Sequence, residues 1–471
     1  MIRRTTAQIA AMCGAEMNEA AARRADDIVR GVSTDSRRPA HGMLFVPLAG
    51  ERFDAHDFAG HAFAGGAAVS LWQAGRPVPE ALTGRPLLLV DDTLAALQRL
   101  AAAYRSQLPV TVIGVTGSNG KTTTKDMIAS VLAQRFKVHK TEGNLNNHIG
   151  LPLTILAMDE DTKAAVLEMG MSGFGEISRL ARIARPDIAV ITNIGDAHLL
   201  QLGSREGIAK AKLEIAEGLA AGGVLFVNGD EPLLTEGAKR AHGYGKWRLE
   251  TFALGERDGG WSAKLIAVAA RDTAFAIRPP DGPEWPGEFR VPAPGRHNAA
   301  NALAAAAVGA RLGLDPESIR QGLASVKLSA MRLETMTAAN GAVVLNDTYN
   351  ASPASVKAMI AFVGELEGYR RKWLVLGDML ELGPEEDRLH YETGASVNPG
   401  EIHAVLAVGE RSKHTVRGAA ERLGPDRALH FGDKDALVRR LLEELSPDDL
   451  VLVKGSRGMR MEEVAQALVR G

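Results

Sequence analysis

The sequence predicts an α/β protein of three domains, and its length and its pattern of apolar runs are the observations that predict it. At 471 residues the chain is long enough for about three domains of ~150 residues each. Short apolar runs that end in glycine or polar residues before a helical stretch are typical of a parallel sheet with helices on both faces. Because this rhythm occurs twice, we expect two such sheets after a smaller first domain. The predicted domains are 1–85, 86–325 and 326–471.

The three regions differ in their pattern of apolar runs, loops and helical stretches. Residues 1–85 mix short strands with loops and end in the loop EALTGRP, so we interpret them as a small α/β domain. In residues 86–325 the apolar runs lead into helices, and after about residue 329 the pattern restarts as a second, Rossmann-like sheet. Ligands of such sheets bind at the carboxyl ends of the strands, so we expect the chemistry there. The runs are VTVIGVTG, AAVLEMG, IAVITNIG and GVLFVNGDE in the central region, and AVVLNDTYNASP, WLVLGDMLELG, AVLAVGE and LVLVKGSRG in the last.

Composition favours a protein that acts on small molecules. Apolar residues make up 45% of the chain and charged residues 24%, and the net charge of −2 does not indicate a nucleic-acid or anionic-membrane partner. The single cysteine, Cys13, excludes an intrachain disulfide, fits a reducing compartment and is expected to be buried. The N-terminus lacks the apolar stretch of a signal peptide, and no uncharged run reaches ~18 residues. We expect a cytoplasmic protein and a monomer.

A glycine-rich loop lies in GVTGSNGKTTTKD, residues 114–126, after the first central run. In the usual phosphate-binding pattern a glycine stands five residues before the glycine of Gly-Lys-Thr, and here Val115 holds that place. Strand, loop, Lys121 and Thr122 still follow in the order of a P-loop, in which the lysine reaches the β- and γ-phosphates and the threonine binds Mg²⁺. ATP is favoured over GTP, and a plain turn into a helix is the weaker alternative. The predicted ATP contacts of this loop are Gly117, Ser118, Asn119, Gly120, Lys121, Thr122 and Thr123.

Two further strand ends carry residue types that bind metals. Glu168 closes AAVLEMG, and His198 lies in TNIGDAHL, just after the strand of IAVIT. A carboxylate and an imidazole at neighbouring strand ends beside a phosphate loop favour Mg²⁺ near the γ-phosphate, although histidine is an unusual ligand for this ion. For either residue alone, a hydrogen-bonded residue at a strand end is an equally good interpretation.

The helix expected in SREGIAKAKLEIAEGLA carries Lys210 and Lys212. Residues two apart on a helix point in different directions, so at most one of these lysines can face a site. A protonated lysine cannot bind Mg²⁺, and a role there requires conversion of the amine to a carbamate, which acts as a carboxylate. The residues alone do not choose between the two lysines.

Further candidates lie in and beyond the stretch PGRHNAANALAAAAVGARLG, which is expected to form a helix. Asn298 and Asn301 fall on one face of it, and their amides can both donate to and accept from an adenine edge. Capping of the helix explains Asn298 equally well. In the last domain the candidates are Arg332 in MRLE and Asp347 in NDTYNASP, for which a surface arginine and a turn-capping aspartate are the alternatives.

Together these motifs resemble those of the Mur ligase family, ATP-dependent enzymes that form amide bonds in peptidoglycan precursor synthesis, and the resemblance covers essentially the whole chain. GVTGSNGKTTTKD is similar to the family's form of the loop, including its departure from the usual spacing. The segments STDSR, GNLNNHIGLPLTIL, LEMGMSGFGEI, NDTYNASPAS and LGDMLELG resemble the branch that joins D-alanyl-D-alanine to UDP-N-acetylmuramoyl-tripeptide through an acyl phosphate. The resemblance implies these two small-molecule substrates, ATP and Mg²⁺, with no nucleic-acid partner and no membrane insertion.

The resemblance also implies roles for single residues. The implied catalytic residues are Lys121, His198, Lys212 and Arg332. The implied Mg²⁺ ligands are Thr122, Glu168, His198 and Lys212, the last as the lysine that is carbamylated in relatives. The implied ATP contacts beyond the loop are Asn301 to adenine, Asp347 to ribose and Arg332 to phosphate. The implied substrate contacts are Ser36 and Arg37 in the region that holds the uridine nucleotide, and Asn146 and Asn147 in the central substrate loop. Lys454, Ser456 and Arg457 are candidates for contact with the dipeptide, and a surface loop is an equally good interpretation of them.

Two alternatives remain open. Another ligase of the family, such as the one that adds the third amino acid or folylpolyglutamate synthase, would share the loop. The first of these usually carries an Asp-Asn-Pro-Arg motif, and no such string occurs here. A regulatory nucleotide-binding module would bind a nucleotide without making a peptide bond, so an assay with all three substrates separates the two classes.

Overall fold

The structure is a computed structural model of the chain, and it describes residues 1–471 except 39–40, 51–52, 196–198, 242–245 and 257. Among the described residues, no helix is both long enough and apolar enough to span a bilayer. The chain divides into two compact units. The first comprises Met1–Ile194, His198–Phe252 and Ala304–Ile319, and the second comprises Gly195–Ala197, Ala253–Leu303 and Arg320–Gly471.

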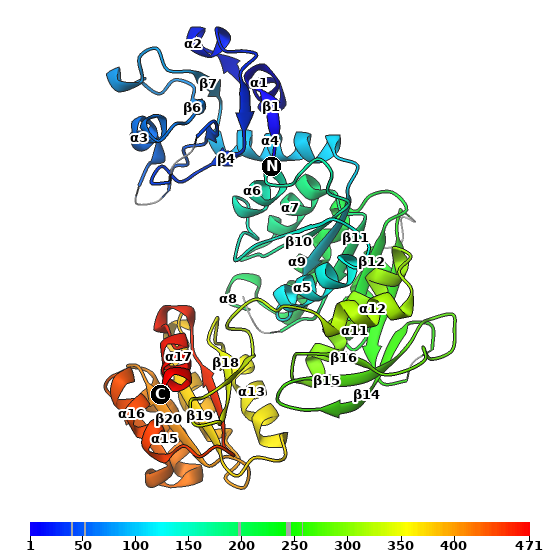
Figure 1. Cartoon of the computed structure of the whole chain (residues 1–471), viewed down its shortest axis with the longest axis vertical. Helices are drawn as coiled ribbons and strands as arrows, with labels where there is room; N and C mark the ends of the chain where they lie inside the picture. The colour runs from blue at the N-terminus through cyan, green and yellow to red at the C-terminus, as the bar shows by residue number, and fades with distance from the viewer. Residues whose placement is uncertain (39–40, 51–52, 196–198, 242–245, 257) are drawn as a thin grey trace. The chain divides into compact units, whose positions relative to one another are not determined.

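The first unit begins with a five-stranded sheet of short strands (Figure 1). Its order is β2-β7-β6-β5-β4, with β2 antiparallel to β7 and the other neighbours parallel. β1 and β3 form a separate antiparallel pair. The small α/β fold predicted at the N-terminus is therefore confirmed. The elements are β1 (Arg3–Thr5), α1 (Thr6–Cys13), β2 (Glu16–Met17), α2 (Glu19–Ala22), β3 (Ile28–Arg30), β4 (Val32–Ser33), β5 (Leu44–Phe45), α3 (Ala59–Ala64), β6 (Val69–Gln73) and β7 (Leu87–Val90).

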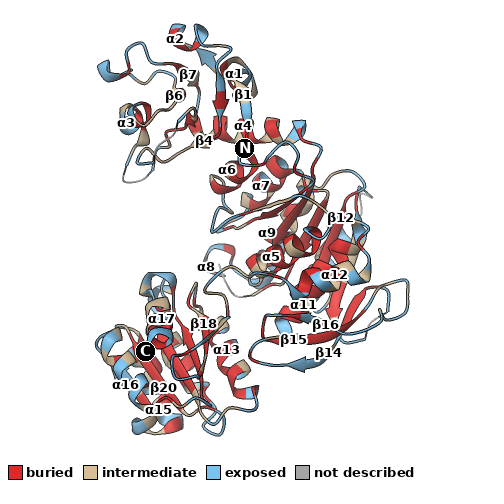
Figure 2. Cartoon of the chain, in the orientation of Figure 1, coloured by how far each residue is buried: buried red, intermediate tan, exposed pale blue. Residues whose placement is uncertain are grey.

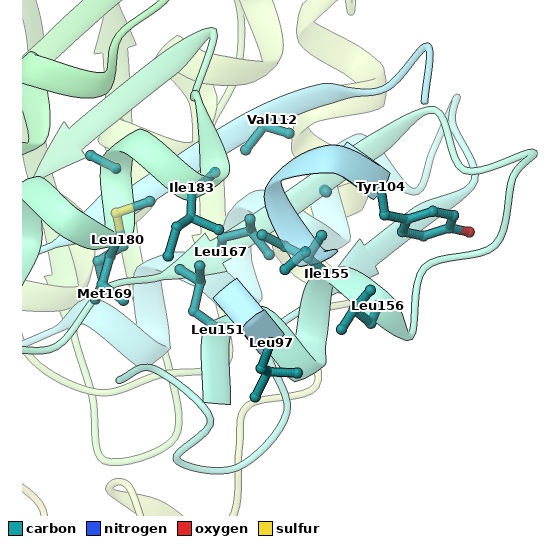
Figure 3. Packing of buried hydrophobic residues seen from close by; sticks show 14 of the residues in the cluster. Leu97, Tyr104, Val112, Leu151, Ile155, Leu156, Leu167, Met169, Leu180 and Ile183 are labelled. Carbon is teal, nitrogen blue, oxygen red and sulfur yellow. The ribbon is translucent and has the colours of Figure 1, made fainter. Parts of the chain in front are cut away.

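Helix α4 (Thr93–Gln107) packs against strand β6 of the small sheet and against three helices, α1, α6 (Gly150–Leu156) and α7 (Glu176–Ala184). It begins where Asp92 Oδ1 accepts a hydrogen bond from the Ala95 N–H at 2.7 Å, a typical N-terminal cap. Its buried side chains belong to one apolar cluster that also contains Cys13, which is buried as predicted, and residues of the larger sheet. The N-terminal and central sheets of this unit thus share a single core. Figure 3 shows Leu97 and Tyr104 of α4 among Leu151, Ile155, Leu167 and Leu180.

The central sheet contains six neighbouring parallel strands in the order β9-β10-β8-β11-β12-β13. β14, β15 and β16 complete a nine-stranded mixed sheet, and β15 is antiparallel to both of its neighbours. All four apolar runs predicted for this region are parallel strands. In register, Glu168 at the end of β10 lies opposite Val115 of β8, which brings the carboxylate to the edge where the glycine-rich loop starts. The elements are β8 (Thr111–Thr116), α5 (Lys121–Leu132), β9 (Val138–Lys140), α6 (Gly150–Leu156), β10 (Ala164–Glu168), α7 (Glu176–Ala184), β11 (Ile188–Ile191), α8 (Leu199–Leu202), α9 (Arg205–Leu213), β12 (Val224–Asn228), α10 (Pro232–Ala241), β13 (Arg248–Leu254), β14 (Trp261–Val268), β15 (Thr273–Arg278), β16 (Phe289–Val291), α11 (Arg296–Arg311) and α12 (Pro316–Ala324).

The last sheet has the order β17-β18-β22-β19-β20-β21, with β17 antiparallel and all other neighbours parallel. Successive residues of β19, such as Leu374 and Val375, belong to two different apolar clusters, because they point to opposite faces that are both covered. Figure 2 shows these strands buried. The Rossmann-like prediction is confirmed. The elements are β17 (Glu334–Thr337), β18 (Val343–Asp347), α13 (Pro353–Glu365), β19 (Lys372–Gly377), α14 (Glu386–Ala395), β20 (Ala404–Val408), α15 (Ser412–Leu423), β21 (Ala428–Phe431), α16 (Lys434–Glu444), β22 (Leu450–Lys454) and α17 (Glu462–Arg470).

Candidate active site

The glycine-rich loop turns strand β8 directly into helix α5, which begins at Lys121. Gly117 has a φ of 152°, and a Cβ there would lie 1.9 Å from Thr192 Oγ1, so any other residue would displace its neighbour. Gly120, with a φ of 76°, immediately precedes the helix. The N–H groups of the first turn of α5 are therefore presented at the carboxyl edge of the sheet, where the helix dipole favours an anion.

The end of strand β11 fixes the conformation of this loop. Thr192 Oγ1 donates to the Asn119 carbonyl at 2.6 Å, and Asn193 Oδ1 accepts from the Asn119 N–H at 3.0 Å. Lys121 Nζ folds back and donates to two loop carbonyls, at 2.7 and 3.0 Å. The Ser118 hydroxyl is buried and has no hydrogen-bond partner in the part of the chain that the structure describes. A phosphate oxygen would supply the acceptor that this hydroxyl lacks.

The Glu168 carboxylate joins the phosphate loop to the central substrate loop. Its Oε2 accepts from Thr122 Oγ1 and its Oε1 accepts from Asn146 Nδ2, each at 2.8 Å. Glu168 is only 2% exposed. Hydroxyl and carboxylate oxygens are hard ligands of the kind that Mg²⁺ prefers, and this Glu168 cluster brings Thr122 Oγ1 and the Glu168 carboxylate together. Asn147 has a local role, because its Oδ1 accepts from the Gly150 N–H at 2.9 Å at the start of α6.

The structure separates the two lysines of helix α9. Lys210 is exposed, and its Nζ lies 5.9 Å from the centre of the Phe174 ring. Lys212 is 1% exposed. Burial lowers the pKa of Lys212 to about 6, with a further contribution from repulsion by Lys121. At neutral pH the Lys212 amine is therefore mostly uncharged, and it lies close enough to Lys121 to interact with it electrostatically. The sequence did not show which of the two lysines faces the phosphate loop, and the structure selects Lys212.

Ser36 and Arg37, the predicted contacts to the uridine nucleotide, are not part of this cluster. His198 lies outside the described residues, and elsewhere in the described chain no three His, Cys, Asp or Glu side chains gather as metal ligands. Ser36 is half-buried. Arg37 is 86% exposed, and its Nε and Nη2 donate to Asp35 at 2.8 and 2.9 Å. These hydrogen bonds lower the pKa of Asp35 to about 2.

In the second unit, the two asparagines of helix α11 bind each other. Asn301 Nδ2 donates to Asn298 Oδ1 at 3.1 Å, and Asn298 Nδ2 donates to the Pro294 carbonyl at 2.8 Å. Both side chains are buried. Since the helix begins at Arg296, Asn298 lies inside its first turn and does not precede it as a capping residue would.

Asp347, at the end of β18, is half of a buried ion pair. Its Oδ2 accepts from Lys454 Nζ at 2.5 Å, and its Oδ1 accepts from the Leu333 N–H at 3.2 Å. Lys454 has only 3% of its side chain exposed, so the surface-loop interpretation is wrong for this residue. The Asp347 carboxylate is held in place from two sides before any ligand binds.

Arg332 is held by an aromatic ring and by an unusual backbone. Its guanidinium carbon lies 4.0 Å from the centre of the Tyr349 ring, a cation–π contact. The residues on either side, Met331 and Leu333, have φ values of 63° and 53°, a left-handed conformation that costs non-glycine residues roughly 1–2 kcal/mol each. This turn sets the direction of the Arg332 side chain.

Two features of the site were missed by the sequence interpretation. Thr192 and Asn193 fix the phosphate loop, and their signal was a polar pair directly after the run IAVI. Lys125 and Asp126 lie buried in α5. The sequence could have indicated Lys125, because it follows Thr122 by three residues and therefore lies on the same side of the helix.

Comparison with known proteins identifies the class to which this site belongs. Residues 115–309 match the Mur ligase middle domain, and residues 331–457 match the Mur ligase glutamate ligase domain. The chain belongs to the Mur ligase family, which confirms the resemblance seen in its motifs.

Individual relatives narrow the comparison within the family. The UDP-N-acetylmuramoyl-tripeptide–D-alanyl-D-alanine ligase of Bacillus subtilis is 46% identical over 469 residues, 100% of this chain and 99% of the relative. The enzyme of that name from Escherichia coli is 39% identical over 448 residues, 94% of each chain. A structure of MurF from Acinetobacter baumannii has a TM-score of 0.88 at 31% identity over 100% of both chains. MurF ligase from Thermotoga maritima, solved in complex with ADP, has a TM-score of 0.78 at 29% identity and covers 94% of this chain and 97% of its own.

Proposed function

We propose that this chain is an ATP-dependent ligase that joins D-alanyl-D-alanine to UDP-N-acetylmuramoyl-tripeptide in peptidoglycan precursor synthesis. The observation that carries the proposal is the Glu168 cluster, in which Thr122 and Asn146 meet one carboxylate at the head of a preformed phosphate loop. The printed names of the relatives from Bacillus subtilis and Escherichia coli support this reaction. The ADP in the structure of MurF ligase from Thermotoga maritima supports the use of ATP.

The reaction has two steps. A carboxylate oxygen of the tripeptide attacks the γ-phosphorus of ATP, ADP leaves, and an acyl phosphate forms. The amine of D-alanyl-D-alanine then attacks the acyl carbon, and a tetrahedral intermediate expels phosphate as the amide bond forms and the amine loses its proton. The protein contributes mainly position and charge, as is general for phosphoryl transfer.

Lys121 and Arg332 supply that charge. Lys121 exchanges its two loop carbonyls for the β- and γ-phosphates, because a charged oxygen is the stronger acceptor. The Ser118 hydroxyl gains a partner in the same way. Arg332 neutralises charge on the transferred phosphoryl group, and the remaining nucleotide contacts are Asn301 to adenine and Asp347 to ribose.

The residues around Glu168 fit Mg²⁺, which when bound offsets the negative charge of the transferring group. Thr122 Oγ1 and the Glu168 carboxylate would hold the metal, together with His198 and a carbamate on Lys212. The uncharged Lys212 amine can form an N–C bond to CO₂ with release of one proton. Because the product is an anion near Lys121, attraction to the positive charge of Lys121 would stabilise the carbamate.

The other substrate contacts follow the same proposal. The uridine nucleotide binds at Ser36 and Arg37, and the tripeptide binds beside Asn146 and Asn147. The protein acts as a monomer in the cytoplasm, where ATP is available. The functional domains are 1–85 for the uridine substrate, 86–325 for ATP and 326–471 for the Rossmann-like part.

The proposal is tested by incubating the full chain with ATP, UDP-N-acetylmuramoyl-tripeptide and D-alanyl-D-alanine and measuring ADP, phosphate and the pentapeptide product. We expect all three products only when all three substrates are present, and we expect Glu168→Gln to abolish them. Product formation with a single amino acid in place of the dipeptide would favour another branch of the family. ADP release that is independent of both other substrates would favour a regulatory nucleotide-binding protein.

A further inference from the structure

Lys125 of helix α5 is a fully buried cation for which the mechanism above has no use. It is 0% exposed, its Nζ donates to the Thr141 carbonyl at 2.7 Å, and it lies 3.3 Å from Asp126 Oδ1. Lys140 Nζ donates to the same carboxylate oxygen at 2.7 Å. An ammonium group removed from water is costly unless it is paired and hydrogen-bonded, so these partners are needed to keep Lys125 inside the protein.

Thr141 connects this cation to the candidate metal site. It directly follows strand β9 and stands where the chain enters the central substrate loop. Its Oγ1 accepts from the Glu168 N–H at 3.0 Å, and its own N–H donates to the Val166 carbonyl at 3.0 Å. Thr141 is 0% exposed, so water does not replace these bonds. Its carbonyl and its hydroxyl therefore link Lys125 to the backbone of Glu168.

Helix α5, which carries Lys125, also carries Thr122, the residue that bonds to the Glu168 side chain. Thr122 and Lys125 are three residues apart in α5, so they lie on one side of it and move together. Thr122 bonds to the Glu168 side chain, while Lys125 acts through Thr141 on the Glu168 backbone. Glu168 is thus connected to α5 twice, through its carboxylate and through its backbone N–H.

We propose that Lys125 is a positioning residue for the metal site: through Thr141 it holds Glu168 and the start of the substrate loop in register with the phosphate-loop helix. This inference rests on the proposed function, because it takes Glu168 to be a Mg²⁺ ligand. Lys125 itself touches neither the metal nor ATP. A merely structural ion pair would change the stability of the protein and leave its affinity for metal unaltered.

The test replaces Lys125 with methionine, which has a similar length but no ammonium group. Mn²⁺ stands in for Mg²⁺ and is titrated into the full-length chain saturated with ADP, with free Mn²⁺ followed by electron paramagnetic resonance. We expect Lys125→Met to bind Mn²⁺ about 10- to 100-fold more weakly, the range typical of residues that orient metal ligands. Affinity for ADP without metal, measured by calorimetry, should change less than about 2-fold, since the loop and its contacts to phosphate are unaltered.

Two further variants separate position from charge. Lys140→Met is the matched control, because it removes an equal charge from Asp126 and leaves Thr141 untouched, and its Mn²⁺ affinity should stay within about 2-fold of wild type. Thr141→Val keeps the carbonyl that Lys125 binds but removes the hydroxyl that accepts from Glu168, so it should weaken Mn²⁺ binding as Lys125→Met does.

The outcomes distinguish this inference from the proposed function. Wild-type Mn²⁺ affinity in Lys125→Met, with weak binding in Glu168→Gln, would overturn the positioning role alone. Wild-type affinity in Glu168→Gln would reject Glu168 as a metal ligand and the inference with it. Equal losses in Lys125→Met and Lys140→Met would assign the effect to net charge and also reject the inference. If Lys125→Met does not fold, unchanged affinity in Thr141→Val rejects it.

Discussion

Replacing Lys212 with methionine removes a buried amine while keeping most of its volume, and we expect ligase activity to fall at least about 10²-fold. The burial that lowers the Lys212 pKa to about 6 supports this expectation. At pH 7.5 a group with that pKa is about 97% uncharged, whereas a lysine with the usual pKa of about 10.4 is only about 0.1% uncharged. Only the uncharged amine reacts with CO₂, so the fold enriches the reactive form about 1,000-fold.

Steady-state release of ADP and phosphate measures this loss, and Lys210→Met is the matched control. It makes the same substitution in the same helix at an exposed position, so activity should remain at the wild-type level. A short carboxylic acid should restore part of the activity of Lys212→Met by replacing the carbamate. After equilibration with ¹³C-bicarbonate, a carbamate signal should appear in wild type and in Lys210→Met only. Full activity in Lys212→Met, or an equal loss in Lys210→Met, would refute the reasoning.

The same substitution has a second readout in the pH dependence of stability. Without CO₂, Lys212 is protonated in the unfolded chain up to its ordinary pKa but is uncharged in the folded protein above about pH 6. The unfolded state therefore binds more protons in this window, and this group makes the folded state more stable as pH rises. Between pH 7 and 9, the difference in free energy of unfolding between wild type and Lys212→Met should grow in favour of wild type, with a slope of about 1.4 kcal/mol per pH unit. Chemical denaturation at several pH values measures the slope, and a difference that is independent of pH would contradict the burial argument.

Three other substitutions probe the nucleotide contacts. Arg332→Ala should lower kcat about 10³-fold and change KM for ATP less, because its charge acts on the transferring phosphoryl group, and an unchanged kcat in steady-state kinetics would reject that role. Asp347→Asn should raise KM for ATP and also lower the free energy of unfolding by about 3 kcal/mol or more, because it leaves Lys454 buried without its counter-ion. Adding Lys454→Met should recover the stability but not KM, and recovery of both would argue against the ribose contact. Gly117→Ala should raise KM for ATP at least about 10-fold, since its Cβ would lie 1.9 Å from Thr192 Oγ1, and calorimetric ADP affinity equal to wild type would show that the loop tolerates the side chain.

The parallel strands were predictable because a strand buried on both faces needs a continuous apolar run. All eight runs, from VTVIGVTG to LVLVKGSRG, form such strands. The antiparallel strand β14 was not predicted, since its second half is largely exposed and has no comparable apolar pattern. The helix predicted over SREGIAKAKLEIAEGLA ends at Leu213 and continues as a tighter turn, which brings Gly218 so close to α7 that a Cβ would lie 2.3 Å from the Ala181 carbonyl.

The sequence by itself determined the features that depend on neighbouring residues: the turn of the phosphate loop at Gly117 and Gly120, the start of a helix at Lys121, and the motifs that define the family. Only the tertiary structure decided which lysine loses its charge and which side chains meet. Lys210 and Lys212 differ by two positions, yet one is in water and the other is buried, and burial is what shifts the pKa. Thr122 and Glu168 are 46 residues apart and meet at 2.8 Å because parallel strands bring their ends to one edge of the sheet. Hydrogen bonds and desolvation act over a few ångströms in space, and the order of residues along the chain does not record those distances.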